Sequence, residues 1–231
     1  MAIEAGPRIV TNGLVYDLDG AVSRSYSGSG LTVYDAETSA IGGTLVNGVT
    51  YSSSNLGYFS FDGVNDFILI PSSYIPTGNE VTICVWNYGT VAVVQSIFSA
   101  MLADNTRILN IHLPWSDSVV YWDAGSSAGS YDRINTAVLS NSQWQGWHFW
   151  VFTKNATTGI MEIYLDGVLN VSGTSKTRTL NTTYEAYIGK FQVTSSVYHN
   201  GRVAQFLIYN RAITASEVLQ NYNSTKKRYG L

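Results

Sequence analysis

The 231-residue sequence has little charge, one cysteine and no long apolar run, and each shortage excludes a class of protein. Charged residues make up 13% of the chain, against roughly 25% in an average soluble domain. The formal net charge is −3, whereas nucleic-acid binding requires a clustered basic footprint. The basic cluster from Lys226 to Arg228 lies at the chain end, where a solvated tail is expected. We therefore predict no nucleic-acid partner.

The single cysteine, Cys84, rules out an internal disulfide framework. It lies within the apolar segment VTICVWNY (81–88), so we expect a buried, inert thiol. No apolar run reaches the roughly 20 residues of a membrane-spanning helix, which predicts no membrane partner. The first ten residues, MAIEAGPRIV, lack the basic head and apolar core of a secretion signal. We therefore expect a protein without a signal peptide, made in a reducing cytoplasm.

The chain contains many short segments of alternating or apolar residues, separated by clusters of Gly, Asn, Asp and Ser. This pattern is typical of a β-sandwich or barrel. No helical period of ten residues occurs before the C-terminal end, which argues against βαβ units. The composition is even from residue 13 to 231, so we predict one all-β domain there, preceded by an N-terminal arm of residues 1–12. The clearest strand segments are GLVYDLD (13–19), GYFSFDG (57–63), EVTICVWNYG (80–89), WHFWVFTKN (147–155), IMEIYLDG (160–167) and RVAQFLIYN (202–210).

Three dipeptides predict tight hairpin turns, because Asn and Gly tolerate the positive φ angles that such turns need. They are Asn47-Gly48, Asp62-Gly63 and Asp166-Gly167. The segment WHFWVF (147–152) is apolar on both faces, which predicts a strand inside a sheet rather than at its edge. In RILNIHL (107–113), strict alternation would place Arg107 on the face of Leu109 and Ile111.

The C-terminal end predicts a short helix. Thr214 and Glu217 have the spacing of a capping box, in which the two side chains satisfy free amides of the first turn. Ile213 and Val218 have the spacing of a hydrophobic staple across the same turn. We expect this helix to follow the last strand and to pack against the sandwich.

Several of these segments together resemble the laminin G-like, concanavalin A-like lectin/glucanase family. The resemblance rests on FDGVNDFILIP (61–71), WHFWVFTKNATTGIMEIYLDGVL (147–169) and GRVAQFLIYNRAITASEVL (201–219), in the family's order, and extends over most of residues 13–222. It implies a two-sheet antiparallel jelly roll with a short C-terminal helix. The ending and the segment LNIHLPWSDSVVYWDAG (109–125) are most similar to the versions in structural proteins of tailed bacteriophages.

Asp62 and Asp66 offer the hard oxygen ligands that calcium (Ca²⁺) takes. The resemblance implies that acidic residues directly before the IYN motif complete such a site. This sequence has Ala204 and Gln205 at those positions, which removes one expected ligand. Two interpretations therefore stay open. Asp62 and Asp66 form a calcium site, or Asp62 stabilises a turn.

The segment NIHLPWSDSVVYWDAG (110–125) combines aromatic rings with amide, imidazole and carboxylate groups. Sugar rings stack on aromatic faces while their hydroxyls form hydrogen bonds, so such a combination suits a glycan. Packing of the tryptophans in the core is the alternative. We expect the last residues of the segment, Asp-Ala-Gly, to form a turn. The predicted glycan-binding residues are Asn110, His112, Trp115, Trp122 and Asp123.

No catalytic residue is predicted. Glycoside hydrolysis needs two carboxyl groups on either side of the scissile bond. The nearest match is Glu162 with Asp166, and Asp166 belongs to a predicted hairpin turn. The sequence therefore favours a protein that is not an enzyme.

The resemblance implies a virion structural protein of a bacteriophage, such as a capsid decoration, fibre or knob module, with weak carbohydrate binding. The expected partners are other capsid or tail proteins, further copies in a homo-oligomer, and cell-surface polysaccharide. A lectin domain for host attachment is the alternative, and a polysaccharide hydrolase or lyase is the least favoured.

Overall fold

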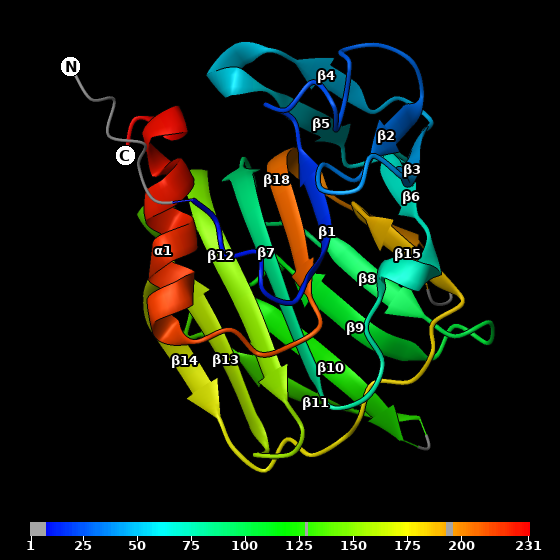
Figure 1. The fold of residues 1–231 in the computed structure, drawn as a ribbon. Coiled ribbons are helices and arrows are strands. Elements are labelled where there is room, and N and C mark those ends of the chain that lie inside the picture. The colour runs from blue at the N-terminus through cyan, green and yellow to red at the C-terminus, as the bar shows by residue number, and fades with distance from the viewer. Residues whose placement is uncertain (1–7, 128, 193–195) are drawn as a thin grey trace.

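The computed structural model describes residues 8–127, 129–192 and 196–231, and within them two antiparallel sheets pack face to face (Figure 1). Sheet A runs in the order β14-β13-β12-β7-β18-β5-β4, and β1 pairs with the C-terminal half of β18. Its strands are β1 (Leu14–Asp19), β4 (Thr50–Ser52), β5 (Tyr58–Asp62), β7 (Glu80–Gly89), β12 (Gly146–Asn155), β13 (Ile160–Leu165), β14 (Val168–Gly173) and β18 (Asn200–Tyr209).

Sheet B runs in the order β11-β10-β9-β8-β15-β6-β3-β2. Its strands are β2 (Thr32–Tyr34), β3 (Ile41–Val46), β6 (Phe67–Ile70), β8 (Phe98–Met101), β9 (Arg107–His112), β10 (Tyr121–Ser127), β11 (Ser130–Asn135) and β15 (Glu185–Ile188). A separate hairpin is formed by β16 (Lys190–Gln192) and β17 (Ser196–Tyr198). The predicted all-β sandwich with a short C-terminal helix is confirmed.

The core lies between the two sheets and consists of the inward side chains of alternating strand residues. Trp150 and Phe152 of β12 face Trp122 of β10, and all three are fully buried. Strand β12 pairs with β7 on one side and β13 on the other, as its apolar residues on both faces predict. Burial of large aromatic side chains on this scale is the main stabilising contribution of the fold.

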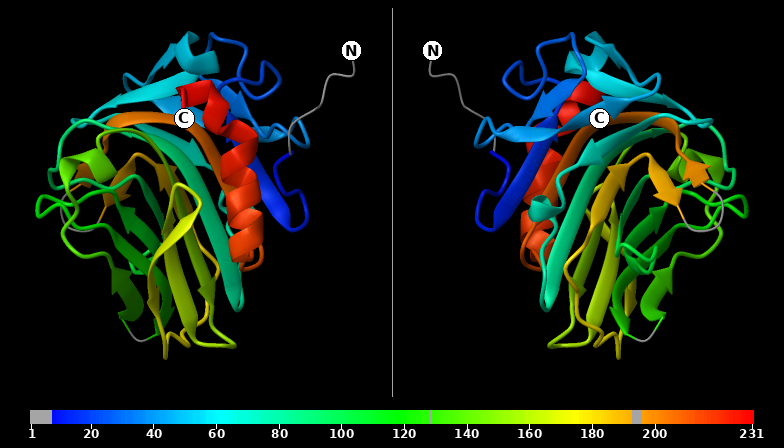
Figure 2. Two further views of the ribbon diagram at one scale, coloured as in Figure 1. Left: turned by 90° about the vertical axis from the view of Figure 1, so that its left-hand side faces the viewer. Right: turned by 90° about the vertical axis from the view of Figure 1, so that its right-hand side faces the viewer.

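Helix α1 (Ala215–Thr225) covers the outer face of sheet A (Figure 2). The predicted capping box is confirmed, because Thr214 Oγ1 accepts from the amide of Glu217 while the Glu217 carboxylate accepts from the amide of Thr214. Ile213 and Val218 are buried on the sheet, as the staple predicts. No helix in the described residues, α1 included, has the length and apolarity needed to cross a membrane.

The last turn, η4 (Lys226–Tyr229), is packed rather than solvated, so the expectation for the basic cluster is wrong for Arg228. The Arg228 guanidinium lies 2.7 Å from a carboxylate oxygen of Asp19, a residue that is 2% exposed. The ring of Tyr229 lies 4.2 Å from that of Trp86. A buried carboxylate requires a charged partner, and the chain end supplies it here.

Residues 8–12, the described part of the expected arm, lie against helix α1. The amide of Val10 donates to Asn221 Oδ1 at 2.8 Å, and the Val10 carbonyl accepts from the Tyr209 hydroxyl at 2.8 Å. Gln220 donates to the carbonyl of Arg8 at 2.8 Å. Residues 1–7 of the arm lie outside the described residues.

The three predicted hairpin turns have different outcomes. Asp166 and Gly167 both have positive φ and join β13 to β14, as predicted. Asn47-Gly48 and Asp62-Gly63 are not hairpins, because β3 and β6 belong to sheet B whereas β4 and β5 belong to sheet A. The dipeptide determines only the φ angles of the turn. The partner of each flanking strand depends instead on which face of the strand must be buried. These two turns therefore carry the chain from one sheet to the other.

Candidate functional site

The outer face of sheet B carries a row of side chains that crosses six strands, and the first five of them are polar. Since neighbouring strands lie about 4.8 Å apart, five strand steps make this row roughly 24 Å long. The row consists of Arg133, Asp123, Asn110, Ser99, Tyr187 and Leu69, each opposite the next. Ser99, Asn110 and Asp123 in the middle of this row are fully buried, so the groups that face solvent lie around them.

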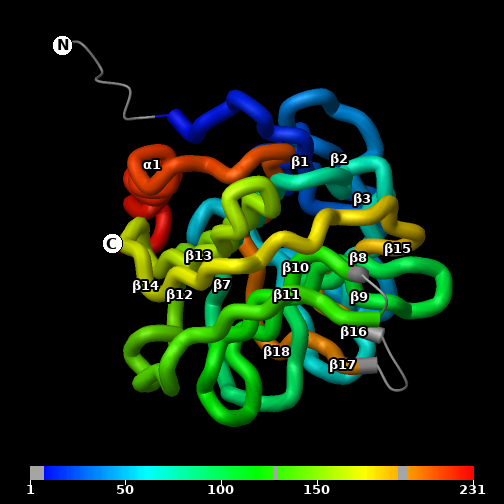
Figure 3. The backbone as a smooth tube through the Cα atoms, turned by 90° about the horizontal axis from the view of Figure 1, so that it is seen from below, coloured from blue at the N-terminus to red at the C-terminus, as the bar shows by residue number. Residues whose placement is uncertain are grey.

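The β16–β17 hairpin folds over part of this face (Figure 3). Ser99 Oγ donates to the Lys190 carbonyl at 2.7 Å, and Phe191 packs with Met101 and Tyr187. Hollows lie on both sides of the hairpin, one set over β9–β11 and another over β3, β6 and β15.

The hollow over β9–β11, called here the arginine hollow, has a volume of about 260 Å³. A second depression of about 190 Å³ adjoins it and shares Arg107 and Phe191. Both volumes are below the roughly 300–1,000 Å³ of pockets for drug-sized molecules, so each depression is small. The arginine hollow is lined by Arg107, His112, Trp115, Tyr121, Arg133, Phe191 and Val197.

Asp123 lies beneath this hollow and holds two guanidinium groups. Arg133 donates to it through Nε at 2.5 Å and through Nη2 at 2.9 Å, while Arg107 donates through Nη1. The Asp123 side chain is fully buried. These hydrogen bonds raise the pKa of Arg133. Charge-assisted bonds of this kind fix both arginines at the floor and wall of the hollow.

Arg107 reaches the outer face of sheet B because of a β-bulge. The expectation that Arg107 shares a face with Leu109 and Ile111 is therefore wrong. The register shifts so that Met101 pairs with Arg107 while the preceding Ala100 pairs with Leu109. Ile108 is the extra residue, and both Ile108 and Leu109 are buried in the core. A bulge of this kind redirects a side chain to the opposite face.

His112 is neutral and supports Trp115. Its Nδ1 lies 2.7 Å from the Gln95 carbonyl, which can only accept, so Nδ1 carries the hydrogen and Nε2 accepts from Asn110 at 2.8 Å. Burial lowers the pKa of His112 to about 4. The centroids of the His112 and Trp115 rings lie 4.3 Å apart. The turn that presents Trp115 closes with a 2.9 Å bond from the amide of Ser118 to the Trp115 carbonyl.

The structure brings four of the five predicted glycan-binding residues to this face and directs Trp122 elsewhere. Asn110, His112 and Asp123 are at least 95% buried, so they act beneath the surface, whereas Trp115 lines the hollow. The glycan-binding role of these four stays a prediction.

The prediction that Trp122 binds a glycan is wrong. Its side chain points into the core, where the indole nitrogen donates to the Thr153 carbonyl at 3.0 Å. A fully buried ring cannot stack on a sugar. The expected Asp-Ala-Gly turn is also absent from its predicted place. Asp123 to Gly125 lie within β10, where Gly125 has φ +77° at a bulge.

The predicted site residues included neither arginine and none of the three rings that flank them. Arg107 Cζ lies 4.5 Å from the ring centroids of Tyr131 and Phe191. Arg133 Cζ lies 4.8 Å from Tyr121 and 5.2 Å from Tyr131. The alternation of YDRIN (131–135) placed Tyr131 and Arg133 on one face, which was the available signal, but it did not reveal that Arg107 joins them.

Asp62 and Asp66 lie at the β5–β6 turn and bind backbone amides. Asp66 accepts from Gly48 at 2.7 Å and from Asp62 at 3.2 Å, and Asp62 Oδ1 accepts from Val64 and Asn65. These bonds lower the pKa of Asp62, while burial raises that of Asp66.

The residues at this turn fit a structural role better than a calcium site. Three of the four carboxylate oxygens of the pair are engaged with amides, whereas calcium takes six to eight oxygen ligands. Asn200 pairs opposite Asp62, so Gln205 lies too far along β18 to contribute. Among the described residues, no group of three His, Cys, Asp or Glu side chains is arranged to hold a metal.

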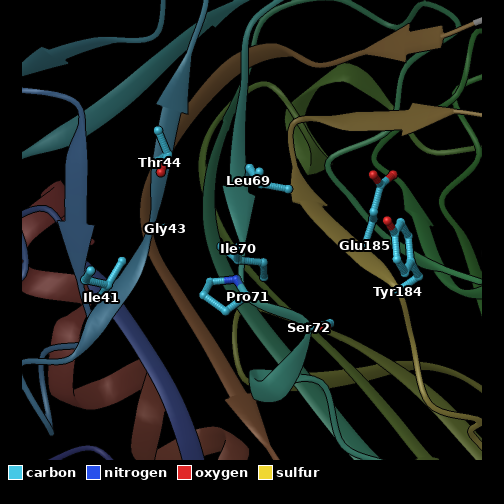
Figure 4. A pocket seen from close by; sticks show the side chains of 9 residues that line it. All are labelled: Ile41, Gly43, Thr44, Leu69, Ile70, Pro71, Ser72, Tyr184 and Glu185. Atoms are coloured by element: carbon cyan, nitrogen blue, oxygen red, sulfur yellow. The ribbon is translucent and has the colours of Figure 1, made fainter. Parts of the chain in front are cut away.

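A larger hollow of about 440 Å³ lies on the other side of the hairpin (Figure 4). Its walls are mostly apolar and include Ile41, Leu69, Pro71 and the strongly exposed Tyr184. The carboxylate of Glu185 is engaged by the Tyr187 hydroxyl. This hollow offers a single aromatic ring and few arranged donors.

The two carboxylates considered for hydrolysis lie on sheet A, on the far side of the sandwich from the arginine hollow. Glu162 accepts from the Tyr164 hydroxyl at 2.7 Å. Asp166 accepts from His148 Nδ1 at 2.8 Å and from the amide of Phe149 at 2.9 Å. Both side chains therefore stabilise local structure.

The family model of the concanavalin A-like lectin/glucanases superfamily matches residues 62–219, which is more than half of the chain. The chain belongs to this superfamily. No curated protein sequence matches it.

Solved structures with the same fold include the binding domains of clostridial toxins. The binding domain of botulinum neurotoxin DC, solved with rat synaptotagmin II, has 16% identity and a TM-score of 0.68, with 92% of this chain and 52% of that chain covered. The binding domain of Paraclostridial Mosquitocidal Protein 1 has 18% identity and a TM-score of 0.70, with the same coverage. A structure of botulinum neurotoxin type C, whose cell entry depends on two ganglioside molecules, has 15% identity and a TM-score of 0.70, covering 92% and 51%. The chain thus spans about half the length of these proteins, and the likeness is one of fold.

Proposed function

We propose that this chain is a non-catalytic carbohydrate-binding domain and that a sugar ring binds in the arginine hollow. The observation that carries the proposal is the combination at one hollow of the Trp115 and Tyr121 rings with two guanidinium groups fixed on Asp123. Sugar rings bind through apolar C–H faces and peripheral hydroxyls, and this hollow presents aromatic surface beside fixed donors.

The same geometry disfavours acid–base catalysis at the hollow. The carboxylate there, Asp123, is fully buried and accepts from both Arg107 and Arg133. A general acid must lie within hydrogen-bond reach of its substrate, and both oxygens of this buried carboxylate are already bound by the two arginines. Recognition is the role that these contacts support. A complex with rat synaptotagmin II and cell entry that depends on two ganglioside molecules, both described for toxins of this fold, agree with a recognition module.

Truncation of Trp115 tests the proposal. A glycan array identifies a ligand, and calorimetry then measures its affinity for the wild type and for Trp115→Ala. We expect Trp115→Ala to weaken binding at least tenfold, about 1.4 kcal/mol, because the stacking surface is lost.

Tyr184→Ala is the matched control, because it removes an exposed ring from the other hollow of the same sheet. It should leave the affinity unchanged. Loss of binding with Tyr184→Ala and not with Trp115→Ala would move the site to the larger hollow and reject the proposal.

We further propose that the domain is displayed on a bacteriophage particle, with capsid or tail proteins and further copies of itself as partners. The support is the resemblance of the segments 109–125 and 208–231 to phage structural proteins. Cryo-electron microscopy of a particle containing this chain tests it. We expect sheet B to face solvent and the helix-covered sheet A, with residues 8–12, to face the particle; an orientation that buries the arginine hollow would contradict the proposal.

A further inference from the structure

The arginine hollow holds more positive charge than its own carboxylate neutralises. One guanidinium group bound through two nitrogens is enough to pair a carboxylate, and Arg133 binds Asp123 in this way. Arg107 binds the same carboxylate, so two positive charges meet one negative charge. Asp117 lies nearby and accepts from the Tyr121 hydroxyl at 2.7 Å, but its side chain is exposed, and water and salt screen its charge. The hollow therefore carries an excess positive charge.

Several donors of the two arginines remain unused among the described residues. Arg107 Nε is buried and has no hydrogen-bond partner there. In the bonds to Asp123, Arg107 uses Nη1, and Arg133 uses Nε and Nη2. Arg107 Nη2 and Arg133 Nη1 take no part in those bonds. A buried donor without a partner is costly, so an acceptor supplied by a ligand would stabilise the site.

The guanidinium groups are also held in place before any ligand arrives. The Arg107 group lies between the rings of Tyr131 and Phe191, at 4.5 Å from each centroid. The Arg133 group lies against Tyr121 at 4.8 Å. Cation–π contacts and the shared carboxylate fix both side chains, so little rotamer entropy is lost when a ligand binds.

We infer that the saccharide bound in the arginine hollow is acidic and presents a carboxylate, as uronic and sialic acids do, to Arg107 and Arg133. The inference rests on the proposed carbohydrate-binding function. The planar fork of arginine matches a carboxylate with two parallel hydrogen bonds. The pyranose ring attached to that carboxylate then lies against Trp115.

Calorimetry with two pairs of probes tests this inference. One pair is hexagalacturonate and the neutral maltohexaose, and the other is sialyllactose and lactose, so the pairs distinguish uronic from sialic acid. We expect an acidic probe in at least one pair to bind about tenfold or more tightly than its neutral partner. The affinity should fall as salt rises, because the excess charge is screened.

Variants of Arg133, whose side chain is 35% exposed, identify the contact. Arg133→Lys keeps the positive charge but loses the planar guanidinium that donates two parallel hydrogen bonds, and Arg133→Gln loses both the charge and that group. We expect acidic-probe affinity to fall in the order wild type, Arg133→Lys, Arg133→Gln, and to fall by a larger factor than neutral-probe affinity does, because the neutral probe loses a hydrogen-bond donor but no ion pair. The matched control is Arg202→Gln, since Arg202 stacks on Tyr88 at 4.6 Å on sheet A, away from the hollow. Thermal melting of each variant reports its folding.

The outcomes separate this inference from the function on which it rests. Equal binding of acidic and neutral probes, abolished by Trp115→Ala but unaffected by Arg133→Gln, would overturn the acidic ligand and keep the carbohydrate site. Binding of a dextran sulfate oligosaccharide as tight as that of the acidic probes would show that the site does not select a carboxylate, and would overturn that part of the inference. Failure of every saccharide on the array and of all four probes to bind would overturn both.

Discussion

The two outer faces of this sandwich have opposite characters. The outer face of sheet A carries large apolar side chains, including Trp86, Phe149 and Tyr209, and is covered by helix α1 and residues 8–12. The outer face of sheet B carries Asp123, Asn110 and their polar neighbours in the same row, and the arginine hollow lies above Asp123. One chain thus builds two similar sheets and uses their outer surfaces differently.

The contrast shows how the protein divides stability from recognition. Covering an apolar face contributes to folding in proportion to the apolar area removed from water. The polar groups of sheet B must instead form hydrogen bonds with one another, as the buried Asn110 does with Ser96 and His112. Polar networks of this kind hold side chains in fixed positions, which a binding face requires.

Truncation of the covered face is expected to have the largest effect on stability. Trp86 is fully buried, stacks near Tyr229 and donates to Thr225 Oγ1 at 2.7 Å. Trp86→Ala should lower the free energy of unfolding by about 3–5 kcal/mol through the lost transfer energy and the cavity left behind. Trp115→Ala on the open face should cost about 1 kcal/mol or less, because its ring is only partly buried. Chemical denaturation measures both free energies of unfolding. Similar losses for the two variants would contradict the proposal that the covered face of sheet A contributes stability and the outer face of sheet B contributes recognition.

An intermediate effect is expected at Asp17, near the edge of the covered face. This carboxylate is 4% exposed and one of its oxygens has no hydrogen-bond partner among the described residues. Burial, reinforced by Asp19, raises its pKa to about 8. The folded protein therefore holds the proton more tightly than the unfolded chain does, so stability is greatest below about pH 4 for this group and falls as pH rises toward 8.

Asp17→Asn mimics the protonated form and should remove this pH dependence. We expect the variant to melt a few degrees higher than the wild type at pH 8 and nearly together with it at pH 5. Asp117→Asn, at an exposed site, is the control and should melt like the wild type at both values. A wild-type melting temperature that is constant between pH 5 and 9 would contradict the account of Asp17.

The smallest effect is expected from calcium. A ligand stabilises a protein according to its concentration relative to the dissociation constant. Because Asp62 and Asp66 mainly bind backbone amides, millimolar calcium should shift the melting temperature by about 1 °C or less. Asp66→Asn should respond to calcium as the wild type does. A clear calcium-dependent shift that this substitution removes would establish the site that the sequence suggested.

Much of the fold was predictable because it depends on local patterns. Thr214 and Glu217 fix the helix start, and WHFWVF must lie between two strands because both of its faces are apolar. Each of these features is determined by residues a few positions apart. The C-terminal contact of Arg228 with Asp19 joins residues that are far apart in the chain, and no local pattern reveals it.

The candidate site was less predictable because it depends on interruptions of the strand pattern. Asn110, His112 and Asp123 were expected to act together and do share one face. The bulge at Ile108 then brings Arg107 beside them, against the alternation of its own strand. The prediction for Trp122 is wrong because β10 continues through the bulge at Gly125 instead of ending in the expected Asp-Ala-Gly turn, and Trp122 and Asp123 therefore point to opposite faces.

The most direct test of the central claim is an NMR titration of the labelled protein with the best-binding glycan from the array. We predict that the shifted amides cluster on β9, β10 and β11 and that the Trp115 indole signal moves with them. Shifts confined to the helix-covered sheet A, or to the turn that holds Asp62 and Asp66, would contradict the assignment of recognition to the open face of sheet B.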